Sequence, residues 1–302
     1  MINMTEGNIE GFRVKFVHMN NLIIGITTDI GPRIIYLAHK ENPDVNLFGV
    51  VPDFSIDTSE GKWRIFGGHR LWVSPEAMPR SYSLDDKPIR IRITDSEVIV
   101  EGNPEPHNSI KKRILIRPIS DNNSIEVVHE IENIGRWPIK FACWAISVMR
   151  RNGFAIVPIK PNPVDEKGLL PDRIIVLWPY TNISDERLIL GKNYIFVKQD
   201  PNIKDPLKIG VKANPPYVAY WIKGYLFVKK ISIESNAEYP DFQSNVEVYT
   251  NNLFLELETL GPLREIEPGE VNRHSEIWKV ISVGELKPLE EDVTRIENAV
   301  NQ

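Results

Sequence analysis

Short runs in which apolar and polar residues alternate cover most of this chain. Residues 12–16 read Phe-Arg-Val-Lys-Phe, and residues 89–93 read Ile-Arg-Ile-Arg-Ile. Alternation with a period of two is typical of half-buried β-strands. The pattern predicts about fifteen strands, at residues 12–16, 22–28, 33–37, 89–93, 98–101, 110–119, 124–134, 139–149, 173–178, 194–198, 217–223, 225–233, 245–250, 253–259 and 273–283.

Helical spacing occurs only near the C-terminus, where Leu289, Val293, Ile296 and Val300 predict a helix over residues 288–300. Strands do not alternate with helices, which argues against a parallel α/β fold, and no fixed repeat supports a propeller. We therefore expect an all-β fold, a large antiparallel β-sandwich with a short C-terminal helix, in which residues 1–302 form a single domain.

Two segments lack this alternation and are predicted to be loops. Residues 45–60 contain Pro52 and two aspartates, and residues 158–172 are rich in proline. A loop as long as the second one is often functional in a compact domain.

The composition of the chain argues against several classes of partner and site. Hydrophobic residues make up 42% of the chain and charged residues 25%, with a net charge of -5 and no basic stripe, so nucleic acid is not expected as a partner. No apolar run is long enough to cross a membrane. The lone Cys143 excludes an intrachain disulfide and a cysteine-based zinc site. The N-terminus lacks a signal-peptide pattern, which predicts a cytoplasmic protein, and the abundance of Ile, Lys and Glu is typical of a thermophile.

The first candidate for chemistry is the stretch Gly67-Gly68-His69-Arg70, followed by Trp72 and Glu76. Glycines allow a tight turn or a close approach of the backbone to a ligand. Histidine can exchange a proton near neutral pH, arginine offers a fork of donors, and a tryptophan face can stack on a sugar ring. The alternative is a tight turn into a strand with its histidine and arginine on the surface.

The second candidate is a hairpin that crowds carboxylates. If Asn251-Asn252 forms a two-residue turn, the predicted pairs are Glu247 with Glu256, Asn245 with Glu258, and Tyr249 with Phe254, all on one face. Like charges opposite one another destabilise a sheet, so a cation, a raised pKa or a ligand should compensate. A solvated outer face is the alternative. His129 lies on an apolar face and is predicted to be a satisfied core residue.

Several short motifs, in order along the chain, resemble the galactose mutarotase-like (aldose 1-epimerase) superfamily, and in particular an uncharacterised prokaryotic branch of it. They are Gly31-Pro32-Arg33-Ile34, Gly67-Gly68-His69, Leu257-Glu258-Thr259 and Pro268-Gly269-Glu270 before a closing strand with Trp278. The resemblance implies a β-supersandwich with a sugar site on a concave sheet face, a small-molecule sugar or sugar derivative as ligand, and no cofactor or metal. It also implies Glu258 as the catalytic base, with His69 and Arg33 holding sugar hydroxyls.

The chain departs from the family pattern at the proton donor. The family's Asn-His pair is absent, and residues 138–146 carry Cys143-Trp144 instead. The donor role would then pass to His69, Arg70 or His129, and Trp144 becomes a candidate stacking platform. Asp172 and Asp241 are the candidates for the family's ring-oxygen-binding aspartate.

Three functions follow from these residues. The first is an aldose or sugar-derivative epimerase, including a sugar phosphate variant clamped by Arg33, Arg70 and Arg80. The second is a carbohydrate-binding protein without turnover, and the third is a glycoside hydrolase or lyase that uses two carboxylates. The candidate site comprises Glu258 and His69 as catalytic residues and, as substrate-binding residues, Arg33, Arg70, Trp72, Glu76, Glu247, Tyr249, Glu256 and Trp144.

Overall fold

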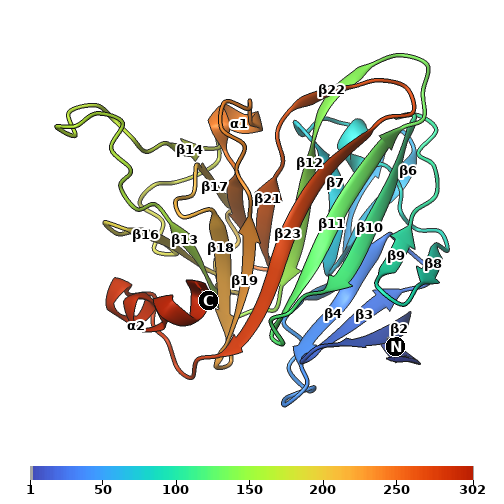
Figure 1. Cartoon of the computed structure of the whole chain (residues 1–302), viewed down its shortest axis with the longest axis horizontal. Helices are drawn as coiled ribbons and strands as arrows, with labels where there is room; N and C mark the ends of the chain where they lie inside the picture. The colour runs from blue at the N-terminus through green and yellow to red at the C-terminus, as the bar shows by residue number, and fades with distance from the viewer. Residues whose placement is uncertain (1–2, 302) are drawn as a thin grey trace.

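The computed structural model describes residues 3–301, and two large antiparallel sheets packed face to face dominate it (Figure 1). The first sheet has eleven strands, in the order β1 (Asn3–Ile9), β2 (Phe12–Met19), β3 (Leu22–Thr27), β4 (Arg33–His39), β7 (His69–Ser74), β12 (Ile139–Met149), β21 (Leu255–Leu260), β20 (Val246–Thr250), β17 (Leu207–Val211) and β14 (Ile175–Leu177), with β22 (Arg264–Ile266) also paired to β12.

The second sheet has ten strands, in the order β15 (Leu188–Leu190), β16 (Tyr194–Lys198), β13 (Phe154–Pro158), β18 (Tyr217–Ile222), β19 (Tyr225–Ile231), β23 (Val271–Ser282), β11 (Ser124–Asn133), β10 (Ile110–Pro118), β9 (Val98–Glu101) and β8 (Arg90–Ile93). The remaining elements are the hairpin β5 (Val50–Thr58) and β6 (Gly61–Gly67), a 3-10 turn at Arg80–Tyr82, α1 (Pro240–Gln243) and α2 (Glu290–Asn301).

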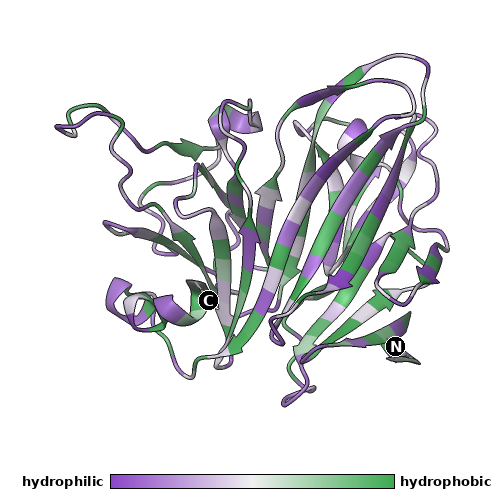
Figure 2. Cartoon of the chain, in the orientation of Figure 1, coloured by the Kyte–Doolittle hydropathy of each residue, from purple (hydrophilic) through white to green (hydrophobic). Residues whose placement is uncertain are grey.

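Alternation of apolar and polar residues builds the core, and Figure 2 shows it as alternating green and purple bands along the long strands. The inward-facing residues of both sheets form one apolar cluster that includes Ile24, Val127, Val248 and Val280, none of them exposed. The all-β prediction is confirmed. The C-terminal helix is confirmed too, because α2 packs Val293 and Val300 against the outer face of the second sheet.

The predicted loop over residues 45–60 is wrong. This segment contains β5, which pairs with β6 and leaves the plane of the two large sheets. The pairing register breaks between Val51 and Ser55, so Pro52 and Asp53 fall in the irregularity, where a missing ladder hydrogen bond is tolerated. The hairpin folds over the outer face of the first sheet, where Trp63 and Ile65 join an apolar cluster with Trp72 and Trp144.

The predicted turn at Asn251-Asn252 is also wrong. The strands pair up to Thr250 and Leu255, and the Asn251 side-chain oxygen accepts hydrogen bonds from the amides of Leu253 and Phe254 at 2.7 and 3.0 Å. The loop is therefore four residues long, and the register shifts by two. Glu247 lies opposite Glu258, and Tyr249 lies opposite Glu256. A shift of two preserves the faces, so the predicted grouping of these residues on one face is correct.

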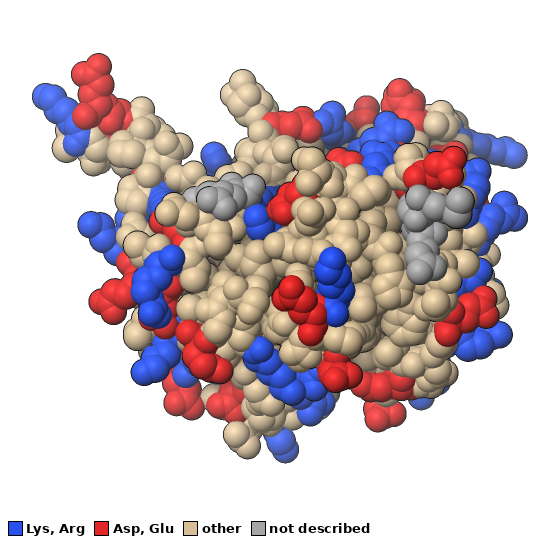
Figure 3. Space-filling model, turned by 60° about the horizontal axis from the view of Figure 1, so that its bottom comes forward, with Lys and Arg blue, Asp and Glu red and all other residues tan. Residues whose placement is uncertain are grey.

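The long proline-rich segment is a loop, as predicted. Residues 160–174 contain no strand or helix, and the loop projects away from the two sheets between β13 and β14 (Figure 1). Charges of both signs are interspersed over the face that Figure 3 shows. Among residues 3–301, no helix is long and apolar enough to cross a membrane.

Candidate functional site

A row of charged side chains crosses the outer face of the first sheet. Cα pairing places Arg33 of β4 beside Arg70 of β7, then Ile146 of β12, and then Glu258 of β21 beside Glu247 of β20. Strand residues alternate between faces, so all these side chains point away from the core between the sheets. The pairing of five strands from distant parts of the chain brings them together.

A cavity of about 320 Å³ opens over this row and is called the cleft below. The β5–β6 hairpin covers one side of it, and the segment after β14 supplies Trp178 and Tyr180 on the other. The residues that line the cleft are Phe54, Ile56, Trp63, Ile65, Arg70, Trp72, Glu76, Tyr82, Trp144, Ile146, Trp178, Tyr180, Pro206, Lys208, Tyr249, Phe254 and Glu256. Aromatic walls with a few charged groups are typical of small-molecule sites and suit the apolar faces of sugar rings.

Lys208 of β17 joins the two carboxylates that the hairpin places opposite each other. Its Nζ lies 2.8 Å from Glu247 Oε2 and 2.9 Å from Glu258 Oε2. The ammonium also lies 4.4 Å from the ring centroid of Trp144 and 4.7 Å from that of Trp178. Lys208 is therefore the cation that compensates the like charges on this face.

Arg70 and Glu256 form a second ion pair, with Nη2 2.9 Å from Oε1. The guanidinium lies 4.5 Å from the ring centroid of Trp72, a distance at which the ring face attracts a cation. Glu256 lines the cleft and its side chain is 11% exposed. Glu258 has no exposure, lies behind Lys208, and accepts a 2.8 Å hydrogen bond from Trp144 Nε1.

Several buried polar atoms around the cleft lack a hydrogen-bond partner among residues 3–301. They are Nε and Nη1 of Arg70, Nε1 of Trp63, Oε1 of Glu258 and both carboxylate oxygens of Glu247, although Oε2 of Glu247 still contacts the Lys208 ammonium. Such atoms are costly in a folded protein, and a ligand or ordered water is one way to satisfy them. A ligand in the cleft would have hydrogen-bonding groups to meet that the described residues leave open.

Burial disturbs the protonation of these groups. It raises the pKa of Glu256 above its ordinary value, against the opposing effect of Arg70. It raises the pKa of Glu247 further, with Glu258 adding to the rise and Lys208 opposing it. Burial also disfavours the charged form of Lys208, but Glu247 and Glu258 outweigh it and hold the pKa of Lys208 well above its ordinary value. Perturbed carboxylates in a cleft are candidates for acid–base chemistry.

The remaining predicted residues take different positions. Arg33 is fully buried, donates to the carbonyl oxygens of Ile65 and Gly67, and pairs with Asp85, so it anchors the hairpin rather than reaching the cleft. Glu76 stands exposed at the rim, where it accepts a hydrogen bond from the Tyr82 hydroxyl. Trp72, Trp144 and Tyr249 line the cleft.

His69 does not join the cleft, and the prediction that it converges there with Arg70 and Glu258 is wrong. The two residues after the glycines are consecutive on β7, so His69 and Arg70 point to opposite faces of the sheet. His69 is fully buried between the sheets, with its Nδ1 2.9 Å from Ser147 Oγ and its Nε2 2.7 Å from His129 Nε2. His129 is a satisfied core residue, as predicted, and its Nδ1 donates to the carbonyl oxygen of His274.

These histidines belong to a buried polar group that is called the interior cluster below. Its members are His69, His129, Ser147, Lys229, Thr259, His274, Glu276 and Trp278. Glu276 is its charged centre and contacts Lys229 Nζ at 2.8 Å, Trp278 Nε1 at 2.6 Å, and the Thr259 hydroxyl. No member of the interior cluster has an unpartnered buried side-chain atom.

Three residues of the interior cluster come close enough to hold a metal ion. Ligand atoms of His69, His129 and Glu276 lie within 4.8 Å of one another. The donor set does not fit an ion, however, because the imidazole nitrogens already bond each other and Lys229, Thr259 and Trp278 occupy both oxygens of Glu276. An additional cation would also have to sit near the buried Lys229 ammonium.

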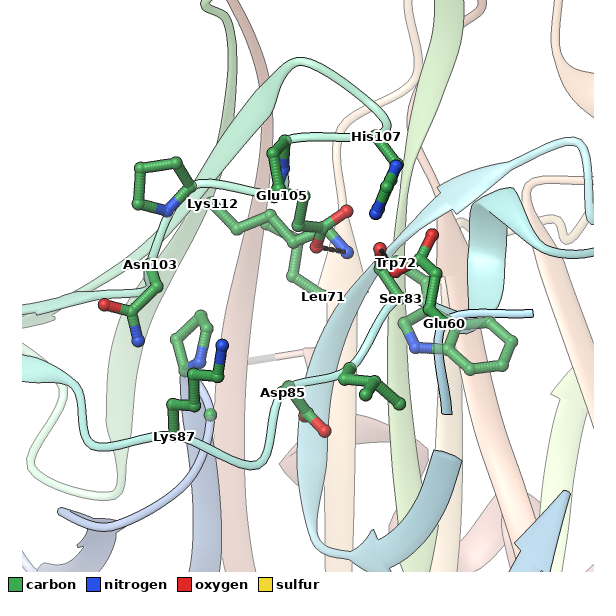
Figure 4. Close-up of a pocket in the computed structure, with 15 residues that line it drawn as sticks. Glu60, Leu71, Trp72, Ser83, Asp85, Lys87, Asn103, Glu105, His107 and Lys112 are labelled. Carbon is green, nitrogen blue, oxygen red and sulfur yellow. Dashed lines mark hydrogen bonds and ion pairs between the residues drawn. The ribbon is translucent and has the colours of Figure 1, made fainter. Parts of the chain in front are cut away.

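A second cavity of about 190 Å³ is lined by residues that include Glu60, Ser83, Asp85, Lys87, Glu105 and Lys112 (Figure 4). One pair of its charged groups is already joined, with Lys112 Nζ 2.6 Å from Glu105 Oε1, and the Ser83 hydroxyl donates to Glu60 at 2.9 Å. It also lacks the aromatic walls of the cleft. We therefore place the candidate site in the cleft.

Lys208 and the hairpin aromatics were missed by sequence reasoning. The alternation of Leu207, Ile209 and Val211 indicates a strand that presents Lys208 on its opposite face, and this signal was available. Its pairing with Glu247 and Glu258 was not, because it depends on contacts between distant strands. Trp63 reaches the cleft only because the hairpin folds over the sheet.

No family model matches the sequence, and no curated protein matches it. Solved structures do match. A putative aldose 1-epimerase from Klebsiella pneumoniae aligns with a TM-score of 0.59 at 11% identity, over 99% of this chain and 86% of that one. A galactose mutarotase-like protein from Lactobacillus casei aligns with a TM-score of 0.52 at 9% identity, over 92% of this chain and all of that one.

A third match is a TPR-domain containing protein from Parabacteroides distasonis, with a TM-score of 0.57 at 12% identity. The alignment covers 92% of this chain and 50% of that one, so this chain spans about half the length of that protein. At these identities the matches show the fold alone. The protein has the galactose mutarotase-like fold, as the sequence resemblance implies.

Proposed function

We propose that this protein binds a monosaccharide in the cleft and interconverts its anomers. The observation that carries the proposal is Glu256, a cleft-lining carboxylate with a raised pKa that stands among tryptophan and tyrosine rings. A carboxylate whose pKa moves toward neutrality is better matched to general base catalysis at neutral pH. The similarity to mutarotase-like structures supports the same chemistry.

In this reaction Glu256 accepts the proton of the anomeric hydroxyl, and the bond between C1 and the ring oxygen breaks as the ring oxygen gains a proton. The aldehyde end rotates and the ring closes on the other face. Arg70 keeps one oxygen of Glu256 in place, and the second oxygen has no hydrogen-bond partner among residues 3–301. Glu258, the base that the family resemblance implies, is the competing assignment, but it is enclosed behind Lys208 and Trp144.

The size and charge of the cleft favour a neutral monosaccharide. A cavity of about 320 Å³ lies at the small end for ligand sites, which argues against the oligosaccharide of a glycoside hydrolase. Each arginine that could clamp a phosphate already has a partner: Arg33 binds Asp85, Arg70 binds Glu256, and Arg80 binds the carbonyl oxygen of Pro75.

Binding without turnover is the second candidate function. It is favoured by one observation: no histidine is among the residues that line the cleft in the described part of the chain. A site without the usual proton donor could hold a sugar and leave it unchanged.

Exchange NMR on a panel of aldoses separates these functions. The wild-type protein should accelerate anomer interconversion, and Glu256→Gln should lower that rate by ~10²–10⁴-fold. Glu258→Gln tests the competing base, and Glu267→Gln, an exposed glutamate that does not line the cleft, is the matched control that should stay close to wild type. Binding of an aldose with no acceleration of exchange by the wild-type protein would support the second candidate and refute the first.

A further inference from the structure

Lys208 is enclosed and yet reaches the cleft. Its side chain is 4% exposed, but it lines the cavity beside Trp144 and Trp178. It comes from β17, near the edge of the first sheet, and crosses above the carboxylates of β20 and β21. A lysine in this position is held far more rigidly than a surface lysine.

The ammonium group has more donors than the carboxylates use. A protonated lysine carries three N–H groups. Glu247 and Glu258 take two of them at 2.8 and 2.9 Å, and no third acceptor contacts Nζ among residues 3–301. The flanking rings of Trp144 and Trp178 attract the positive charge through their faces. One N–H therefore remains for a ligand that enters the cleft.

The other cleft donors are less suited to give up a proton. Arg70 is bound to Glu256, and the guanidinium of an arginine does not release a proton in proteins. The Tyr82 hydroxyl already donates to Glu76. Burial raises the pKa of Tyr180, and no hydrogen bond orients its hydroxyl among the described residues. A lysine can release and regain a proton, and the carboxylates of Glu247 and Glu258 stabilise the ammonium form of Lys208.

We propose that Lys208 is the proton donor to the ring oxygen of the bound sugar, an assignment that rests on the proposed anomer interconversion. As the bond between C1 and the ring oxygen breaks, its electron pair moves to the ring oxygen, which takes a proton from Lys208. Glu256 takes the proton of the anomeric hydroxyl, whose oxygen becomes the aldehyde oxygen. Ring closure reverses both transfers, so the protein returns to its starting protonation state and no co-reactant is consumed.

The arrangement explains why a buried lysine is placed between two glutamates. After donation, Lys208 is a neutral amine beside Glu247 and Glu258, and the negative charge of these residues favours its return to the ammonium form. The same carboxylates hold the pKa of the resting lysine well above its ordinary value, so the ammonium is a weak acid. The transfer is driven by the ring oxygen, which becomes a strongly basic alkoxide as its bond to C1 breaks.

The test compares Lys208→Met, Lys208→Arg and Tyr180→Phe by exchange NMR, with aldose binding measured by calorimetry on the same samples. We expect Lys208→Met to bind the sugar within about tenfold of wild type and to lose ~10²–10⁴-fold in exchange rate. Lys208→Arg should not restore exchange, because arginine keeps its charge but does not release its proton. Tyr180→Phe tests the other candidate donor of the cleft: a ~10²–10⁴-fold loss of exchange in this variant, with Lys208→Met exchanging at the wild-type rate, would overturn the assignment.

The inference is overturned if Lys208→Met exchanges anomers as fast as wild type, or if Lys208→Arg restores the rate, which would assign Lys208 a purely electrostatic role. If Lys208→Met does not fold, the double variant Lys208→Met/Glu247→Gln removes one of the stranded charges and gives the same comparison. Failure of the proposed function is distinct, because the wild-type protein itself would then accelerate exchange of none of the aldoses.

Discussion

The cleft lies on the outer face of the first sheet and the interior cluster lies between the two sheets, with β7, β12 and β21 contributing side chains to both. The two regions are built from the same kinds of residue. Each has a buried lysine that pairs with a buried glutamate, and each has at least one tryptophan indole beside the charges. On β7 the two regions are one residue apart, with His69 in the interior cluster and Arg70 in the cleft. Burial and charge alone would therefore mark both as candidate sites.

The two regions differ in how completely their hydrogen bonds are made. Every buried side-chain donor and acceptor of the interior cluster has a partner, whereas around the cleft atoms of Arg70, Trp63, Glu247 and Glu258 have none. A satisfied network rigidifies a core, and an unsatisfied one beside a cavity is expected to be completed by something that binds. This difference distinguishes polar residues that stabilise the core from polar residues that can bind a ligand.

Among the variants considered, Glu276→Gln should cause the largest loss of stability. It leaves the Lys229 ammonium buried without its counter-ion. We expect a loss of about 3–5 kcal/mol in the free energy of unfolding, because an uncompensated buried charge is costly. Urea denaturation followed by tryptophan fluorescence measures it. The double variant Lys229→Met/Glu276→Gln should recover most of the loss, since removal of both charges leaves none stranded and the glutamine oxygen can still accept from Trp278. A double variant no more stable than Glu276→Gln would show that the pair contributes more than charge balance.

Acid should weaken the interior cluster through its histidines. Burial lowers the pKa of His129, lowers that of His69 well below its ordinary value with His129 and Lys229 adding to the effect, and lowers that of His274 to about 3. A histidine that is neutral when folded contributes stability above its unfolded pKa of about 6.5, and this is lost as the pH falls. Each such histidine costs about 2 kcal/mol between roughly pH 7 and pH 5.

His69→Gln tests this at one position, because glutamine can still hydrogen-bond Ser147 and His129 but takes up no proton. Denaturation at both pH values should show a loss on acidification that is smaller than in wild type by about 2 kcal/mol. Glu256 in the cleft has the opposite effect on stability. Because its pKa is raised, the folded state takes up a proton more readily than the unfolded state as the pH falls from neutral, and this favours folding. An unchanged acid loss in His69→Gln would mean that His69 is not held neutral.

How much of this was visible in the sequence depends on whether the deciding contact is local. The period of two assigns faces correctly, so Tyr249, Glu256 and Glu258 share a face even though the turn between their strands is four residues long rather than two. The same rule, applied to His69 and Arg70, separates them onto opposite faces. Grouping them in one site gave more weight to the motif than to the alternation of the strand.

The rest of the site depends on contacts across the chain. Lys208 meets Glu247 only because β17 pairs with β20, and Trp63 faces the cleft only because the β5–β6 hairpin folds over the first sheet. That hairpin was not predicted, since Pro52 and the aspartates near it suit an irregular strand as well as a loop. The fold class was predictable because it rests on patterns repeated in many strands.

The smallest expected change in stability comes from replacing tryptophan by phenylalanine. It gives a direct comparison, because the same substitution can be made in both regions. Trp278 is fully buried in the interior cluster and donates to Glu276 at 2.6 Å, whereas Trp63 is 2% exposed beside the cleft and its Nε1 has no partner among the described residues. Replacement by phenylalanine removes the indole N–H and a similar volume from each. Trp278→Phe leaves a charged acceptor short of a donor, while Trp63→Phe removes a donor that was already unpaired.

We therefore expect Trp278→Phe to lower the free energy of unfolding by at least about 1 kcal/mol more than Trp63→Phe, as measured by chemical denaturation of the two variants. Trp63→Phe should instead weaken aldose binding by calorimetry, because the lost N–H is one that a ligand or a water in the cleft can use. If Trp63→Phe proves as destabilising as Trp278→Phe, then the Trp63 indole has a partner within the protein. The cleft would then be as satisfied as the interior cluster, and the main physical reason for placing a ligand there would be gone.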